Sequence, residues 1–293
     1  MGVASISIAA FFFGSVLAAG PVRATEPIHL ETPSEREVER WLPEGGALDG
    51  RELYDRFLKN RRRLRTAYQR GRIVSSDPGG NPQEVRFWMH WKDYRDAADD
   101  AVNGLYSKAL VKLSGPHEVR HSGYLYVHRS DRSDDQFMYS PNRGRTARVR
   151  VHGQSVAGTD FTFDDFLLTL DDIEAADYRR FPDEELGGVP VYVVEAVMRP
   201  SSESRYTRSI SYLEQEHYVP LRTRYWDEVG VESKLQVSPH SAVREFDGVW
   251  LATVSTMTDL LEDTDSTMHI DLLVPNPGLA DDVFSFTALE AKP

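Results

Sequence analysis

Apolar and polar residues alternate over many short stretches of this 293-residue chain, and this pattern limits its fold more than any other feature. The clearest stretches are residues 86–92, 108–113, 191–198, 219–225 and 268–272. Successive side chains of a β-strand point to opposite faces, so this period indicates strands with one buried face. Turn signals rich in Gly, Pro and Asn separate the stretches. We therefore predict about a dozen antiparallel strands, and so long a sheet must close, curl or be covered.

Helical patterns flank and interrupt the alternation. Ser34 and Glu37 have the spacing of a capping box, and Asp49 can cap a second helix over about residues 51–70. We predict N-terminal helices over about 34–70, a sheet over about 71–290 and one helical interruption at 163–173. These helices are the available cover for the sheet, so the expected class is α+β. Since no Pro- or Ser-rich linker divides residues 25–293, we predict one domain.

The first 24 residues differ from the rest. An apolar run over residues 6–19 is followed by small residues at Val22 and Ala24, which suit cleavage after Ala24. We predict a signal peptide over 1–24. Because no Lys or Arg precedes the run, an uncleaved anchor or a different start codon stays an alternative. No second apolar stretch approaches the roughly 20 residues that a membrane span needs.

Composition excludes several function classes. The formal net charge of −12 disfavours nucleic-acid binding, which needs a basic surface. The chain has no cysteine, which excludes disulfides, thiolate metal sites, a cysteine nucleophile and a lipid-modified N-terminal cysteine. One local block, residues 59–65, is basic and contains Arg61, Arg62 and Arg63. It is either a solvated helix face or a docking patch for an anionic lipid or an acidic partner.

Residues 117–121 spell HEVRH, which matches the zinc-peptidase pattern H-E-x-x-H. That pattern works only on a helix, where both imidazoles share one face. Here Gly115 and Pro116 precede it and Gly123 follows it, so the window is too short for a stable helix. We predict a loop that leads into a strand. No serine-hydrolase elbow, Walker loop or dinucleotide motif is present either, so we predict no enzyme, no catalytic residues, no metal and no cofactor.

Residues 158–166, GTDFTFDDF, resemble the S/T-D-F-S/T-Y/F-E/D-D-L/F signature of bacterial LolA-like proteins, known as outer-membrane lipoprotein-sorting proteins. Further similar segments follow in the family's order over roughly residues 70–290: 122–125 (SGYL), 137–141 (FMYSP), the Arg-rich 143–150, 191–196 (VYVVEA), 218–222 (YVPLR), 230–234, and a closing strand at 282–289. The Asp- and Arg-rich loop 129–135 and the uncharged start of the export segment depart from the family pattern.

The resemblance implies a single large curved antiparallel sheet, a half-open barrel, with helices and an apolar cavity on its concave side. It also implies a periplasmic carrier of lipids or lipidated proteins, often associated with RND-family inner-membrane exporters. Transfer of a lipid tail from an apolar environment into water costs about 0.8 kcal/mol of free energy per CH₂, so a carrier needs a cavity that excludes water. The candidate lining residues, all on alternating strand faces, are Phe87, Met89, Trp91, Val111, Tyr192, Val194, Leu221, Tyr225 and Ile270.

Two functions stay open at this point. The first is a monomeric periplasmic carrier or chaperone that takes part in envelope lipid or lipoprotein trafficking. The second is an envelope regulatory or sensor domain of the same fold, whose core is filled and which binds a protein partner through the basic block. Side chains that line a cavity and side chains that fill a core have the same pattern in a sequence.

Overall fold

A computed structural model describes residues 48–76, 80–151, 153–167, 173–200, 202 and 204–292. The predicted signal peptide and the predicted helix start at Ser34 lie outside these residues. Among the described residues, no helix combines the length and the apolar character that a membrane crossing would need.

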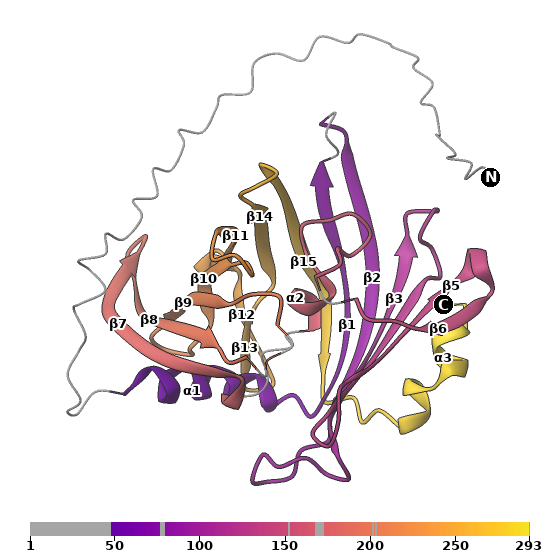
Figure 1. The fold of residues 1–293 in the computed structure, drawn as a ribbon, viewed down its shortest axis with the longest axis horizontal. Coiled ribbons are helices and arrows are strands. Elements are labelled where there is room, and N and C mark those ends of the chain that lie inside the picture. Colours follow the sequence, from indigo (N-terminus) through magenta and orange to yellow (C-terminus); the bar gives the residue numbers. More distant parts are fainter. Residues whose placement is uncertain are drawn as a thin grey trace, which may run out of the picture. The chain divides into compact units, whose positions relative to one another are not determined.

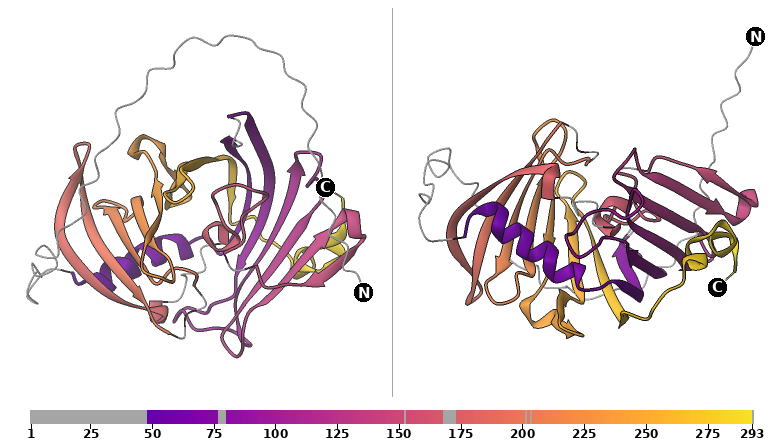
Figure 2. Two further views of the ribbon diagram at one scale, coloured as in Figure 1. Left: turned by 45° about the horizontal axis from the view of Figure 1, so that its top comes forward. Right: turned by 90° about the horizontal axis from the view of Figure 1, so that it is seen from below.

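Thirteen strands form one antiparallel sheet in the order β6-β5-β4-β3-β2-β1-β15-β14-β11-β10-β9-β8-β7 (Figure 1). Their bounds are β1 Thr66–Ser76, β2 Pro82–Asp93, β3 Leu105–Gly115, β4 Gly123–Arg129, β5 Asp135–Ser140, β6 Arg145–Arg148, β7 Ala176–Leu186, β8 Val189–Met198, β9 Arg208–Glu214, β10 Pro220–Trp226, β11 Glu232–Val237, β14 Val254–Asp259 and β15 Thr264–Pro275. Strands β6 and β7 are the two edges, so the sheet does not close into a barrel. It bends around the short helix α2, Phe163–Leu167 (Figure 2). The predicted curved, half-open antiparallel sheet is confirmed.

The remaining elements are short. A second hairpin, β12 (Val243–Phe246) and β13 (Val249–Ala252), stands apart from the large sheet. Single 3₁₀ turns occur at η1 Pro141–Arg143, η2 Ile173–Ala175, η3 His240–Ala242 and η4 Asp281–Phe284.

Helix α1, Gly50–Arg62, begins as the sequence predicts. Asp49 accepts a hydrogen bond from the backbone of Glu52, whose side chain accepts one from the backbone of Asp49, which completes a capping box. The predicted end at Arg70 is wrong, because β1 already begins at Thr66. The apolar residues of 64–73 fit both the helical and the strand period. In the structure this segment is a strand, because β1 lies inside the sheet and pairs with β2 on one side and β15 on the other.

Helices cover both faces of the sheet. On the concave face, Phe161 and Phe163 pack against strands β1–β5, and α1 packs against β7 and β8. On the other face, Leu289 of α3 (Phe286–Glu290) packs against Leu110 and Leu125. The predicted closing strand at 282–289 is therefore wrong. Ser285 caps α3 by accepting a hydrogen bond from the backbone of Ala288, so this stretch ends the described chain as helical turns.

Candidate functional site

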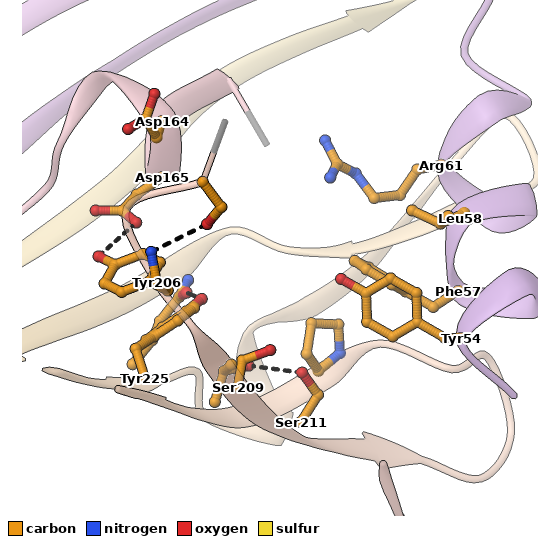
Figure 3. Close-up of a pocket in the computed structure, with 14 residues that line it drawn as sticks. Tyr54, Phe57, Leu58, Arg61, Asp164, Asp165, Tyr206, Ser209, Ser211 and Tyr225 are labelled. Carbon is orange, nitrogen blue, oxygen red and sulfur yellow. Dashed lines mark hydrogen bonds between the residues drawn. The ribbon is translucent and has the colours of Figure 1, made fainter. Parts of the chain in front are cut away.

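A cavity of about 80 Å³ lies between α1 and the concave face of β9 and β10 (Figure 3). Five elements and one loop surround it: the helices α1 and α2, the strands β9, β10 and β11, and the loop before β9. The lining residues are Tyr54, Phe57, Leu58, Arg61, Asp164, Asp165, Ser204, Tyr206, Ser209, Ser211, Pro220, Thr223, Tyr225 and Gln236. The cavity therefore joins segments that are up to 182 positions apart in the sequence, from Tyr54 to Gln236.

The two walls of this cavity differ in chemistry. Helix α1 presents Tyr54, Phe57 and Leu58, whose apolar stripe follows from the 3.6-residue helical period. The strands present hydroxyl groups, because Ser209 and Ser211 alternate along β9 with apolar residues that face the other side of the sheet. The resulting cavity is amphipathic: it has one apolar wall and one wall that can form hydrogen bonds.

The hydroxyl wall is partly hydrogen-bonded within itself. The hydroxyl groups of Ser211 and Thr223 lie 3.4 Å apart, and the Tyr225 hydroxyl donates to the side-chain oxygen of Gln236 at 2.9 Å. Ser209 also lines the cavity and is only 2% exposed. Ser209 is thus a ready hydrogen-bonding position for a guest molecule.

The end of the cavity next to α2 carries the partly buried carboxyl group of Asp165. Asp165 accepts hydrogen bonds from the backbone of Thr162 at 2.8 Å and from the Tyr206 hydroxyl at 2.9 Å. Burial raises the pKa of Asp165 in spite of these bonds and of the nearby Lys234. Burial also raises the pKa values of Tyr206 and Tyr225, so both phenols stay protonated hydrogen-bond donors. These groups can form hydrogen bonds with a polar group placed in the cavity.

Five of the predicted lining residues gather in the main apolar cluster of the concave face. Phe87, Val111 and Tyr225 are buried there, and Met89 and Trp91 pack against it. Phe161 and Phe163 from the chain itself lie in the same cluster. Of the nine predicted residues, Tyr225 alone lines the cavity described above. The β1–β5 half of the concave face is therefore filled by residues of this chain.

The other four predicted residues fall in three different places. Tyr192 and Val194 face α1, and Ile270 packs beside Leu273 near the β13 hairpin. Leu221 belongs to a cluster with Val193, which alternates with Val194 and lies on the opposite face of β8. The inclusion of Leu221 in one concave set is therefore wrong. An irregularity in the pairing of β10 with β9, between Pro220 and Arg222, shifts the register at this residue.

The basic block does not form one patch. Arg61 lines the cavity, the guanidinium of Arg62 pairs with Asp99 at 3.3 Å, and Arg63 donates to the carbonyl of Gly248 at 3.0 Å. The side chain of Arg62 is only 9% exposed. Three consecutive residues of a helix end point in different directions because each turns by about 100° relative to the last. The three side chains therefore do not form one common surface, and a docking role for any of them stays a prediction.

Residues 117–121 form the turn between β3 and β4, as the sequence predicts. His121 has a φ of +71°, which is incompatible with a helix, and its backbone N–H bonds to the carbonyl of Leu113. The two imidazoles therefore lack the common helical face that zinc peptidases use. No group of three or more metal-ligating side chains comes together within the described part of the chain.

Comparison with solved structures identifies the fold. A DUF1329 family protein from Desulfovibrio piger superposes with a TM-score of 0.71 at 21% identity, covering 81% of this chain and 97% of that one. A domain from Vibrio parahaemolyticus, named for outer membrane lipoprotein sorting, gives a TM-score of 0.68 at 19% identity over 81% and 97% of the two chains. A LolA superfamily protein from Nitrosomonas europaea gives 0.61 at 14% identity over 82% and 98%. No curated protein matches the sequence.

The open curved sheet with helices on its concave face is thus a LolA-like fold, and the resemblance predicted from the sequence is confirmed. A family model described as "uncharacterized protein"-like matches residues 106–291, which is more than half of the chain. The chain belongs to that family.

Proposed function

We propose that this protein is a periplasmic carrier or chaperone that binds a lipid, or the lipid of a lipidated protein, on the concave face of its sheet. The observation that carries the proposal is the amphipathic cavity between α1 and the hydroxyl wall of β9 and β10. An amphiphile has both an apolar and a polar part, so this pair of walls matches it. The LolA-like fold and the lipoprotein-sorting name of a structural relative agree with this function.

The periplasmic location rests on the predicted signal peptide together with that relative. An RND-family exporter as partner stays a prediction from the family resemblance, because no contact of the described residues bears on it. The proposal includes no catalytic step.

The size of the cavity adds a condition. Pockets for small molecules usually measure about 300–1,000 Å³, whereas this cavity measures about 80 Å³. A whole acyl chain therefore requires more room than the present arrangement offers. We define the filling segment as residues 153–167, which bring Val156, Phe161 and Phe163 into the apolar cluster of β1–β5. Withdrawal of this segment would expose the largest apolar surface on the concave face.

A small polar clip holds the filling segment to the sheet. The carboxylate of Asp160 accepts hydrogen bonds from Thr264 at 2.6 Å and from Ser266 at 2.5 Å on β15. The backbone carbonyl of Asp160 accepts a further bond from the ammonium group of Lys234 on β11. These contacts involve one residue of the segment, so they can break and re-form as a unit. We propose that the segment withdraws when a lipid enters.

Native mass spectrometry and lipid extraction of the freshly purified protein test the function directly, together with titration of a fluorescent fatty acyl probe. We expect a co-purified amphiphile or saturable probe binding that the extracted lipid displaces. Protein that carries no lipid and binds no acyl probe would refute the carrier function. The Leu58→Asp variant should weaken probe binding, because it places a charge on the apolar wall.

A cross-link tests the withdrawal of the filling segment. The chain has no cysteine, so the pair Asp160→Cys and Ser266→Cys can form a single disulfide between the segment and β15. Acyl-probe binding should be lost on oxidation and restored by a reducing agent. The matched control is Ser238→Cys with Ser255→Cys, whose hydroxyl groups lie 2.6 Å apart within the sheet. Equal probe binding by the oxidised and reduced Asp160/Ser266 pair would show that the lipid enters without moving the segment.

A further inference from the structure

Two neighbouring hairpin turns present an unusual set of exposed apolar side chains. Val229 and Val231, in the β10–β11 turn, are 82% and 47% exposed. Leu260 and Leu261, in the β14–β15 turn, are 39% and 59% exposed. Single exposed apolar residues are common on soluble proteins, but turns are normally built from Gly, Pro, Asn, Asp and Ser. The two most exposed large apolar residues of the described chain, Val229 and Leu261, both lie here. We call these four residues the turn patch.

The two turns lie side by side because β11 pairs with β14. Lys234 is opposite Asp259 in that pairing, and the backbone N–H of Leu260 donates to the carbonyl of Ser233 at 2.9 Å. Both turns project from the same end of the sheet (Figure 1). The turn patch is therefore one surface built by two hairpins.

Each turn is fixed by an aspartate at its base. The side chain of Asp227 accepts hydrogen bonds from the backbones of Val229 at 3.0 Å and Val231 at 2.9 Å. In the same way, Asp259 accepts from the backbones of Leu261 at 3.0 Å and Glu262 at 3.1 Å. Such side-chain-to-backbone bonds give the turns a defined conformation. A patch that is already ordered loses little entropy when a partner covers it.

Exposed carboxylates surround the turn patch: Glu228, Glu262, Asp263 and Asp265. A groove of about 410 Å³ adjoins it, lined by Gly153, Arg205, Asp227, Glu228 and Val229. The guanidinium of Arg205 donates to the carbonyl of Gly153 at 3.0 Å and so is turned toward its own chain. The surroundings of the turn patch are therefore mainly acidic.

We propose that the turn patch is the docking surface for a protein partner that offers an apolar recess bordered by lysine and arginine. Charge complementarity selects this occupant, because the acidic border repels an anionic membrane surface and also a second acidic patch of the same kind. The inference does not depend on the proposed lipid-binding function, since none of its residues lines the cavity beside α1. The surface is also separate from the arginines at the end of α1.

The probe for the test is a fluorescein-labelled amphipathic peptide of leucine and lysine, about 14 residues long. Its binding to the full chain is followed by fluorescence anisotropy. We expect saturable binding that weakens as salt is added, because exposed charges are screened. The same peptide with glutamate in place of lysine should not bind. Failure of the lysine peptide to bind would overturn the proposal.

Two variants and two matched controls localise the binding. Leu261→Asp should weaken it by about tenfold or more, whereas Leu272→Asp, at an exposed leucine of β15 outside the turn patch, should change it by less than about twofold. The double charge reversal Glu228→Lys/Glu262→Lys should likewise weaken it by about tenfold, and the equal reversal Glu185→Lys/Glu245→Lys should not. Equal effects of variants and controls would overturn the proposal, because the peptide would then sense only net charge or general hydrophobicity.

Two further measurements exclude other occupants. Co-sedimentation with vesicles of phosphatidylglycerol and phosphatidylethanolamine should show no binding that depends on Leu261. Light scattering over a range of protein concentrations should give the same mass for the wild type and the Leu261→Asp variant. If Leu261→Asp abolishes binding to vesicles, the turn patch contacts a membrane. If the wild type is a dimer and the variant is a monomer, the turn patch contacts a second copy of the chain. Either result overturns the proposal.

Discussion

The concave face has two halves, one over β1–β5 and one over β9 and β10. Both are built by alternating inward and outward side chains, but they are packed differently. Over β1–β5 the inward residues are large and apolar, and Phe161 and Phe163 pack onto them until the space is filled. Over β9 and β10 the inward residues include Ser209, Ser211 and Thr223, and a cavity remains between them and α1. One half is a filled core, and the other keeps a cavity. The residue types on the strands decide which.

The physical reason lies in what an empty space costs. A void among apolar side chains loses dispersion contacts on every side, so a chain segment that can fill it stabilises the fold. A space with hydroxyl groups on one wall can hold water, which satisfies those groups. Filling it with another apolar segment would leave the hydroxyls without partners. The hydroxyl wall therefore keeps the cavity from being filled as the other half is.

The largest effect on stability is expected when one phenylalanine in each half is replaced by alanine. Phe161→Ala should lower the free energy of unfolding by about 3–5 kcal/mol, since the ring is 1% exposed in a filled cluster. Phe57→Ala should lower it by roughly 1–2 kcal/mol, because this ring already borders the cavity and has fewer contacts to lose. Urea unfolding monitored by tryptophan fluorescence measures both values.

Phe286→Ala serves as the control for this pair, because its ring is 49% exposed on the other face and should cost the least. Equal losses for Phe161 and Phe57 would mean that the two halves are packed alike, and the comparison would fail. A small loss for Phe161 with unchanged cooperativity would mean that the filling segment is only weakly attached.

Much of the filled half of the concave face, over β1–β5, can be predicted from the sequence. The alternation places Phe87, Met89 and Trp91 together on one face of β2, where the structure has them, and Asp49 marks the start of α1. These features depend on local period and capping, which a sequence displays directly. The LolA-like signature at 158–166 correctly indicates the fold around it.

The cavity itself could not be predicted. Leu221 changes face at an irregularity of β10, and an irregularity of this kind leaves no mark in the sequence. Ser209 and Ser211 of β9 line the cavity. A search for a uniformly apolar cavity does not select them, because their side chains are polar. Whether Phe87 lines a cavity or fills a core depends on where residues 74 positions later, at Phe161, come to rest. Only the hydroxyl alternation at 209 and 211 could have pointed to the site.

A smaller effect is expected from breaking the polar clip that holds the filling segment to the sheet. Asp160→Ala removes the acceptor for Thr264 and Ser266 and should lower the free energy of unfolding by about 1–3 kcal/mol. It should also increase the affinity for an acyl probe, because the filling segment then withdraws more easily. The control Thr256→Val removes a hydroxyl pair of 2.9 Å between β14 and β15 and leaves the segment attached. If both variants lose stability and neither gains affinity, the clip is structural only.

The smallest effect concerns how the stability of the protein depends on pH through Asp165, at the end of the cavity next to α2. Burial raises the pKa of Asp165 in the folded state. The contribution of this group to stability is therefore fully present below its unfolded pKa of about 4 and is lost as the pH rises through the folded value. Asp165→Asn cannot ionise, so its stability relative to the wild type should improve between pH 3 and pH 7.

Asp281 provides the opposite sign, because hydrogen bonds from Lys92 and Tyr94 lower its pKa. Its contribution is present above the unfolded pKa and is lost as the pH falls, so Asp281→Asn should become less stable relative to the wild type over the same pH range. Urea unfolding at several pH values gives both difference curves. If the stability difference between Asp165→Asn and the wild type did not change with pH, water in the cavity would reach that carboxyl group. Asp165 would then belong to the open half, and the boundary with the filled half would lie on the other side of α2.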